Sequence, residues 1–171
     1  IQKKSFFSSS INKLFIPASV KELKEGWCCE TPHLKEVIIS PKNQHYKYLD
    51  EKHQIIVGKS DNNIENYDTI IFASRNIKNC IIPKTIKYID SFAFEHCGQL
   101  KSIEFSKDSE LLKIGECAFS LTKISKLTIP ASVVQLYNMA FFGCPKLEEV
   151  EFEKSSKILS FTNHLFSNCF E

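Results

Sequence analysis

One apolar pattern recurs along this chain and restricts the folds that it can adopt. An apolar residue is followed by two more, three and five positions later, and this arrangement, L-x-x-L-x-L, occurs six times. The copies begin at Ile11, Leu34, Ile77, Leu100, Ile124 and Leu147. Because the last four starts are 23, 24 and 23 residues apart, the chain is predicted to be an array of one repeated supersecondary unit.

The second half of each repeat is periodic as well. A small or apolar residue stands beside phenylalanine, and a cysteine follows the phenylalanine by three positions in most copies. The pairs are Ala93-Phe94, Ala118-Phe119, Ala140-Phe141 and Leu165-Phe166, and the cysteines are Cys97, Cys144 and Cys169. Because the same order of side chains returns each time, we predict that these residues face one shared core.

A single repeat of this kind is too small to fold alone. About six buried apolar side chains at ~2 kcal/mol each contribute roughly 12 kcal/mol. Ordering about 23 residues costs ~1–2 kcal/mol apiece, which is more than one repeat supplies. Neighbouring repeats must therefore stack, and we predict a leucine-rich-repeat solenoid of the horseshoe-like α/β class, rich in β-structure, with about six stacked repeats of 22–25 residues.

The first half of each repeat has the alternation of a short β-strand. In L-x-x-L-x-L the residues at +3 and +5 point inward, whereas those at +2 and +4 point outward from the same strand. The strands are expected to lie parallel on a concave face. Proline follows the +5 position at Pro17, Pro83 and Pro130 and would end the pairing there, so the return segments are expected to be irregular or briefly helical.

The repeats resemble the BspA-like leucine-rich repeats of surface proteins from bacteria and parasitic protists. The hallmark of that family is I-P-x-S-V-x-x-I-x-x-x-A-F-x-x-C. Residues 129–144 carry it nearly whole, residues 82–97 carry it well, and residues 16–20 carry its first half. The first copy departs from it with Trp27-Cys28 in place of alanine-phenylalanine, and the second copy is expected to lose its return half. The resemblance implies an adhesive or antigenic binding protein without an active site.

Residues 43–73 interrupt the repeats within a solenoid that otherwise spans 1–171. Two short apolar segments, residues 55–57 and 70–72, are separated by a polar run rich in turn residues. This pattern predicts a β-hairpin insertion. We expect the hairpin to cover a gap in the core, and its tip is a second candidate contact site because loops on a rigid scaffold often carry recognition.

Composition argues against several kinds of partner. The net charge is +2, and among 22 basic residues only Arg75 is arginine, so nucleic acid is not an expected partner. No apolar run reaches the ~20 residues of a membrane helix. The chain begins without methionine, and we expect it to be a fragment of a longer protein. The expected location is the cell surface or the secreted fraction, with the cytoplasm as the alternative.

The residues that commonly carry chemistry do not form a recognisable catalytic or metal motif. The seven cysteines contain no C-x-x-C pair, and we interpret them as structural thiols; the repeat register indicates that Cys80, Cys97, Cys144 and Cys169 are small buried apolar groups. Zinc binding by Cys28, Cys29 and His33, and a bridge from Cys29 to Cys28 or Cys117, remain as weaker alternatives. The five histidines share no repeat position, and the five glycines form no phosphate loop. We therefore predict no enzyme activity, no cofactor and no metal.

The outward residues of the strands are the predicted binding site. Their first half is apolar and their second half is mostly acidic, so one end offers hydrophobic contact and the other electrostatic selection. Six strands about 4.8 Å apart would present a face about 24 Å long, enough for a peptide or a domain surface. An alternative interpretation is that the apolar residues stand there for β-propensity and cross-strand pairing. The candidate residues are Phe15, Ile38, Ile81, Glu104, Lys126, Thr128, Glu149 and Glu151.

This face leads to two hypotheses about function. The first is a non-enzymatic macromolecule-binding module for cell-surface adhesion, whose partner is a protein or an extracellular-matrix ligand. The second is an intracellular protein-protein interaction scaffold that uses the same face. Seven cysteines without a clear pairing pattern and the absence of an N-x-S/T glycosylation site favour the second.

Overall fold

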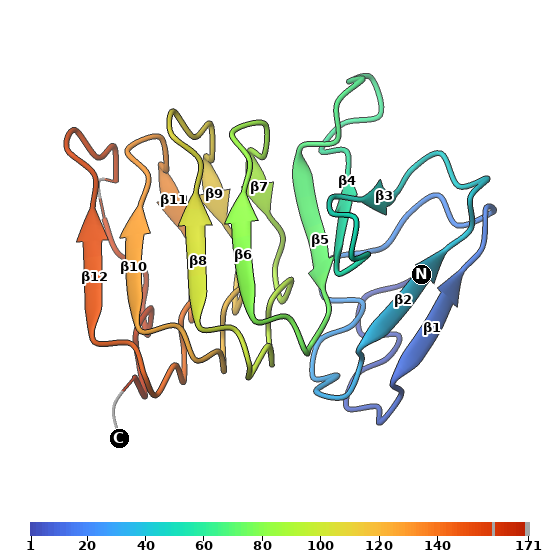
Figure 1. The fold of residues 1–171 in the computed structure, drawn as a ribbon, viewed down its shortest axis with the longest axis horizontal. Coiled ribbons are helices and arrows are strands. Elements are labelled where there is room, and N and C mark those ends of the chain that lie inside the picture. Colours follow the sequence, from blue (N-terminus) through green and yellow to red (C-terminus); the bar gives the residue numbers. More distant parts are fainter. Residues whose placement is uncertain (159, 170–171) are drawn as a thin grey trace.

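The repeats stack into a solenoid without helices. The computed structural model describes residues 1–158 and 160–169 and contains only strands and turns within them (Figure 1). Every L-x-x-L-x-L segment forms a four-residue strand, which confirms the predicted leucine-rich-repeat solenoid. These strands are β1 (Lys13–Ile16), β2 (Glu36–Ile39), β6 (Asn79–Ile82), β8 (Ser102–Phe105), β10 (Lys126–Ile129) and β12 (Glu149–Phe152).

The alternation along these strands is the one that the sequence predicts. In β10, Leu127 and Ile129 are buried whereas Lys126 and Thr128 are exposed. Pairing is parallel and in register from one repeat to the next, so that Leu127 lies opposite Val150. We call the surface formed by the outward residues of β1, β2, β6, β8, β10 and β12 the strand face.

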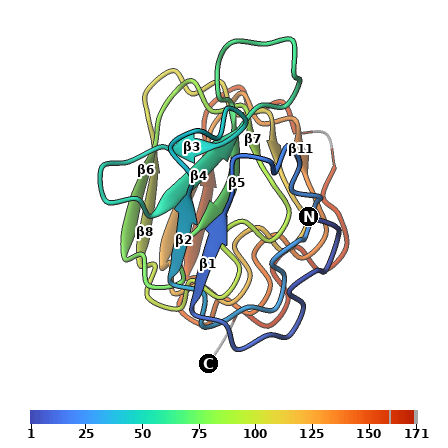
Figure 2. The same ribbon diagram turned by 90° about the vertical axis from the view of Figure 1, so that its right-hand side faces the viewer.

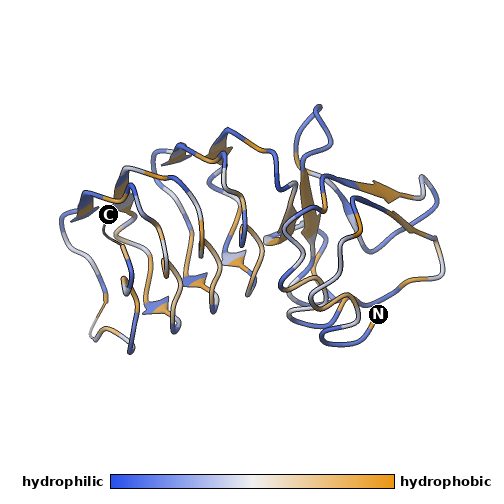
Figure 3. Cartoon of the chain, turned by 90° about the horizontal axis from the view of Figure 1, so that it is seen from below, coloured by the Kyte–Doolittle hydropathy of each residue, from blue (hydrophilic) through white to orange (hydrophobic). Residues whose placement is uncertain are grey.

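The return segments differ from the expectation, because their described residues form short strands and no helix. They form β7 (Tyr88–Ile89), β9 (Lys113–Ile114) and β11 (Gln135–Leu136), which pair in parallel. One apolar residue of each strand faces the core, while hydrogen bonds between successive repeats satisfy the backbone. Seen from below, these strands and the long ones occupy opposite sides of the solenoid (Figure 3). We call the side of β7, β9 and β11 the return side.

Each complete repeat then closes through a wide turn that contains two residues with positive φ, four positions apart. Successive turns are held together by backbone hydrogen bonds, for example from the His96 amide to the Ser120 carbonyl at 3.0 Å and from the Leu121 amide to the Phe142 carbonyl at 2.9 Å. These bonds offset the cost of a left-handed conformation at residues that are not glycine. The pairs are Lys4 and Ser8, Gly26 and Glu30, Phe92 and His96, Cys117 and Leu121, Met139 and Gly143, and His164 and Asn168.

Between these positive-φ residues lies the predicted phenylalanine, and the phenylalanines stack into a continuous column. The ring centroids are 4.9 Å apart for Phe94 and Phe119, 5.4 Å for Phe119 and Phe141, and 5.4 Å for Phe141 and Phe166. Phe94, Phe119 and Phe141 are fully buried. The column confirms that the repeat positions face one shared core.

The insertion contributes to the solenoid in a way that the sequence does not suggest. Strands β4 (Ile55–Gly58) and β5 (Thr69–Ala73) form an antiparallel hairpin, and β3 (Lys47–Tyr48) pairs with β4. Strand β5 also pairs in parallel with β7, with Ile70 opposite Ile89. The expectation that the second repeat loses its return half is therefore wrong, because β5 supplies the return strand. What this repeat lacks is the wide turn with its two positive-φ residues.

The hairpin also divides the core, because both of its faces are buried. Ile55, Val57 and Ile70 belong to the large apolar cluster that contains the phenylalanine column. Ile56 and Phe72 pack on the other side, in a second cluster that surrounds Trp27 and the first two repeats. Figure 2 shows β4 and β5 standing beside β1 and β2 at this end of the molecule.

This arrangement interrupts the row of strands. The long strands form three hydrogen-bonded pairs, β1–β2, β6–β8 and β10–β12, and β2 is not paired with β6. In Figure 1, β6, β8, β10 and β12 stand side by side, whereas β1 and β2 are tilted away beyond the hairpin. The expected uninterrupted six-stranded face is therefore wrong, since the inserted hairpin separates its first two strands from the other four.

Candidate binding face

The structure places the predicted binding residues on the outward side of the strands. Ile81 is 66% exposed and Phe15 is 56% exposed, although both lie on strands whose last residues, Ile82 and Ile16, are completely buried. Ile38 is only partly exposed. The remaining predicted residues are exposed: Glu104, Lys126, Thr128, Glu149 and Glu151.

The apolar residues do not form one patch, because they lie on both sides of the hairpin. Phe15 and Ile38 are paired neighbours on β1 and β2. Ile81 is on β6, where its paired neighbour is Glu104 of β8. The strand face therefore offers two separate apolar contacts, one in each part of the solenoid.

The acidic end of the face is partly neutralised within the chain. The Lys126 Nζ lies 3.0 Å from a Glu149 carboxylate oxygen and 3.5 Å from one of Glu151. The hydrogen bond that the Lys126 ammonium donates to Glu149 is the main reason why the pKa of Lys126 is raised. All three side chains are exposed, so this network contributes little to stability. Among the described residues, Glu104 is the acidic group of the strand face that forms no ion pair.

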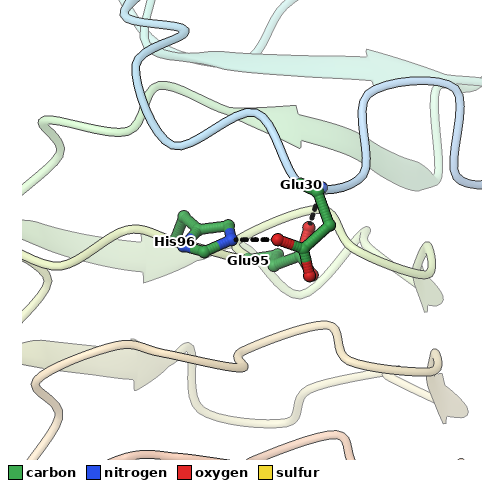
Figure 4. Close-up of side chains that lie close together, drawn as sticks. All are labelled: Glu30, Glu95 and His96. Atoms are coloured by element: carbon green, nitrogen blue, oxygen red, sulfur yellow. Dashed lines mark hydrogen bonds and ion pairs between the residues drawn. The ribbon is translucent and has the colours of Figure 1, made fainter. Parts of the chain in front are cut away.

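A partly buried polar cluster that sequence reasoning missed fills the place of the absent wide turn. In the other repeats a turn amide donates to a carbonyl of the next turn. The Glu30 amide has no such carbonyl beside it, and it donates instead to the Glu95 carboxylate at 2.7 Å. The His96 Nε2 lies 3.1 Å from the Glu30 carboxylate (Figure 4). Side chains of the third repeat thus reach across the second to the first.

Arg75 completes this cluster from the second repeat itself. Its guanidinium donates to the carbonyls of Ala93 at 3.0 Å, Ala73 at 3.2 Å and Cys28 at 3.4 Å, and it lies 4.8 Å from the centre of the Phe72 ring. Arg75 is 4% exposed, although arginine is seldom buried without partners. The positive charge serves to satisfy backbone carbonyls. The only sign of this role in the sequence is that Arg75 is the single arginine of the chain.

The donor atoms of Glu30, Glu95 and His96 lie within 4.8 Å of one another and are of types that bind metal ions. Burial raises the pKa of Glu95, while the Glu30 amide and the positive charge of Arg75 lower it. Because Glu95 already accepts the Glu30 amide and faces the Arg75 charge, we interpret the cluster as structural. Cys28, Cys29 and His33 are not part of any such group among the described residues.

The cysteines are free thiols, and most of them belong to the core. Burial raises the pKa of Cys28 and Cys80 to about 12 and that of Cys97 to about 11, as expected for apolar surroundings. Cys169 differs, because a hydrogen bond from Cys144 lowers its pKa to about 7. The predicted burial is confirmed for Cys80, Cys97 and Cys144, whereas Cys169 is only half-buried. Cys28 and Cys29 are buried as well, and Cys117 is half-buried.

The part of the chain that the structure describes has no helix that is long and apolar enough to span a membrane. A groove of about 930 Å³ lies not on the strand face but on the return side. Residues 59–62, from the predicted contact site at the hairpin tip, line one wall of it. No repeat pattern marks this groove, since it forms where the insertion and the first repeat meet the return strands of the later repeats.

Comparison with known proteins agrees with this architecture. A leucine-rich repeat protein from Eubacterium ventriosum is 22% identical and superposes with a TM-score of 0.79 over 94% of this chain and 41% of its own. A leucine-rich cell surface protein from Faecalibacterium prausnitzii is 21% identical, with a TM-score of 0.70, over 97% of this chain and 48% of its own. The pneumococcal vaccine antigen PcpA is 22% identical, with a TM-score of 0.51, over 85% of this chain and 31% of its own.

At these identities the likeness concerns the fold, and this chain spans less than half the length of each of these proteins. No curated protein matches it. The sequence profile of the BspA type leucine-rich repeat region matches six copies, over residues 1–50 and 62–171. The match omits only the middle of the insertion. This chain therefore belongs to the BspA-type leucine-rich repeat family.

Proposed function

We propose that this chain is a non-enzymatic, macromolecule-binding repeat module of a cell-surface or secreted protein, and that it holds a protein or extracellular-matrix ligand on its strand face. The observation that carries this proposal is the exposure of Ile81, whose side chain stands in water at 66% while its strand neighbours Cys80 and Ile82 are buried. The equivalent outward positions of later repeats hold Glu104, Thr128 and Glu151. A large apolar group at such a position favours contact with a partner.

The separate pair Phe15 and Ile38 supports the proposal as a second contact point. The two sites lie on either side of the hairpin, so one extended ligand or one domain surface would touch both. Two weak contacts on one rigid scaffold bind more tightly than either does alone. The cell-surface location is supported by the Faecalibacterium prausnitzii relative, which is described as a cell surface protein.

An intracellular interaction scaffold is the second candidate, and the cysteines favour it. All seven are free thiols, including Cys144 and Cys169, which are close enough to form a hydrogen bond. Thiols at such a distance persist in a reducing compartment. Labelling intact source cells with a membrane-impermeant reagent separates the two candidates, since only a surface protein reacts before lysis.

The experiment for the strand face compares three variants in binding to immobilised extracellular-matrix proteins. Ile81→Lys and Phe15→Lys are expected to weaken binding at least about tenfold while the circular dichroism spectrum is unchanged. Val134→Lys is the matched control, because Val134 is an apolar residue, 45% exposed, in a return segment. Equal binding by all three variants would move the site away from the strand face.

A further inference from the structure

The groove on the return side is built from three parts of the chain that are distant in sequence. Its floor is formed by the return strands β7 and β9 and the residues that follow them. One wall is formed by residues 21–23 and 25 of the first repeat, and the other by the hairpin tip, residues 59–62. Figure 2 shows the loop between β4 and β5 projecting on the side of the molecule where the N-terminal segment lies. At about 930 Å³ the groove is large enough for several residues of an extended peptide.

Gly115 makes the floor of the groove compact. A Cβ atom at this position would lie 2.5 Å from the Ser91 nitrogen and 2.8 Å from the Asp90 carbonyl carbon, closer than such atoms approach. The backbones of two successive repeats therefore meet here without a side chain between them. Asp90, Gly115 and Tyr137 occupy the same position, directly after the return strand, in three successive repeats. Asp90 and Tyr137 therefore lie on either side of Gly115, and both line the groove.

Two neighbouring carboxylates line the groove, Asp90 on the floor and Glu25 on the wall beside it. The Ser91 hydroxyl donates to Glu25 and accepts from the Glu116 amide, while the Ser91 amide donates to Asp90 at 2.9 Å. Burial raises the pKa of Asp90 to about 6, and the Glu25 charge acts in the same direction. None of the ion pairs among residues 1–158 and 160–169 includes either carboxylate. The groove therefore holds a half-buried acid, Asp90, beside an exposed one, Glu25, and no described residue forms an ion pair with either.

Three lysines and two further acids, Glu22 and Asp61, also line the groove, and Glu22 is paired with Lys24. The placement of the lysines limits what the groove accepts. Lys59 lies over the Tyr67 ring, 5.4 Å from its centre, and neither Lys21 nor Lys113 forms an ion pair with the two acids. A polyanion such as a nucleic acid would meet the two carboxylates, and a polybasic segment would meet the three lysines. A segment with a single basic residue between neutral residues fits both conditions.

Arginine suits the acidic pair better than lysine does. Its planar guanidinium presents several donors in a fixed fork and can bond two carboxylates at once. The phenol rings of Tyr88 and Tyr137, which also line the groove, offer flat surfaces against which the stem of such a side chain can pack. The charge and the shape of the groove therefore point to the same ligand group.

We propose that the return-side groove is a second protein-binding site, which takes an extended segment of a partner through one arginine side chain held between Asp90 and Glu25. This site lies on the side of the solenoid opposite the strand face, and it does not depend on the function proposed for that face. A partner bound here also touches the hairpin tip, which gives the insertion a role in recognition.

The experiment uses nuclear magnetic resonance of the ¹⁵N-labelled chain with two pentapeptides. The probe is acetyl-Gly-Gly-Arg-Gly-Gly-amide, and the control peptide replaces arginine by citrulline, which has the same shape without the charge. The arginine peptide is expected to shift the Ser91 and Gly115 amide signals in a saturable way. The citrulline peptide is expected to bind at least about tenfold more weakly.

The variants Asp90→Asn and Glu25→Gln are each expected to weaken binding of the arginine peptide about tenfold or more. Glu104→Gln on the strand face is the matched control and should leave the shifts unchanged, as should Ile81→Lys. Equal binding of the two peptides, or undiminished binding by Asp90→Asn, would overturn the proposal. Because Ile81→Lys alters only the strand face, failure of one proposed site is distinguishable from failure of the other.

Discussion

Replacing Phe119 by alanine is the most direct test of the shared core. Phe119 lies in the middle of the phenylalanine column, is fully buried, and has a stacked ring on each side, Phe94 at 4.9 Å and Phe141 at 5.4 Å. Removing a buried phenylalanine costs ~3–5 kcal/mol through lost burial and the cavity left behind. Because two stacking contacts are lost with it, we expect about 4 to 5 kcal/mol, toward the upper end of that range.

Two spectroscopic probes make this test specific for the architecture. Far-ultraviolet circular dichroism follows all the strands, while the single tryptophan, Trp27, is buried in the second cluster beyond the hairpin. In a stacked array each repeat is coupled mainly to its neighbours. We expect Phe119→Ala to shift the circular dichroism transition in urea much more than the Trp27 fluorescence transition, because the hairpin lies between the two.

The control for this experiment is Phe161→Ala, since Phe161 is 61% exposed and should change the free energy of unfolding by less than ~1 kcal/mol. If Phe119→Ala were as mild as Phe161→Ala, the phenylalanines would not form the core and the repeat register would be wrong. If both probes of Phe119→Ala shifted equally, the hairpin would transmit stability between the two clusters rather than separate them.

Two further predictions concern the floor of the return-side groove. Gly115→Ala should lower the free energy of unfolding by ~1–3 kcal/mol, because the new Cβ would overlap the Ser91 backbone at 2.5 Å. Gly98→Ala, whose Cβ would meet its nearest atom at 4.0 Å, should be nearly neutral in the same urea titration, and equal effects would refute this account. Asp90→Asn should match the wild type near pH 4 and become more stable than it as pH rises to 7. The pKa of Asp90 rises from 3.8 to about 6 on folding. The wild type therefore keeps its full stability below pH 3.8, and its free energy of unfolding falls by up to about 3 kcal/mol as pH rises through 6. A stability difference between Asp90→Asn and the wild type that does not change with pH would contradict it.

The strands, the stacking and the buried phenylalanines follow from the sequence because each depends on local spacing. A strand alternates with a period of two, so Leu127 and Ile129 had to face the core once Lys126 and Thr128 faced water. The position of Phe119 is equally local, since it follows from the same count in every repeat. The outward exposure of Ile81 was predictable for the same reason.

The role of the insertion was not predictable, because it depends on contacts between distant segments. Two apolar runs predict a hairpin but do not tell whether one of its strands joins the return ladder. Strand β5 does so, and both of its faces are buried as a result. Because the second repeat has no wide turn, no carbonyl of a neighbouring turn accepts the Glu30 amide. The Glu95 carboxylate accepts it instead, which gives Glu95 a structural role.

The sequence by itself determined the repeat length, the inward and outward side of each strand, and the family, since all of these are periodic along the chain. Tertiary structure alone decided where the strand face breaks, why Arg75 is buried, and that Asp90 and Glu25 meet in a groove. The physical reason is that a periodic pattern specifies only contacts between equivalent positions of neighbouring repeats. Apart from β5, residues 43–73 have no equivalent in the other repeats, so their contacts follow from the space that the stacked repeats leave for them.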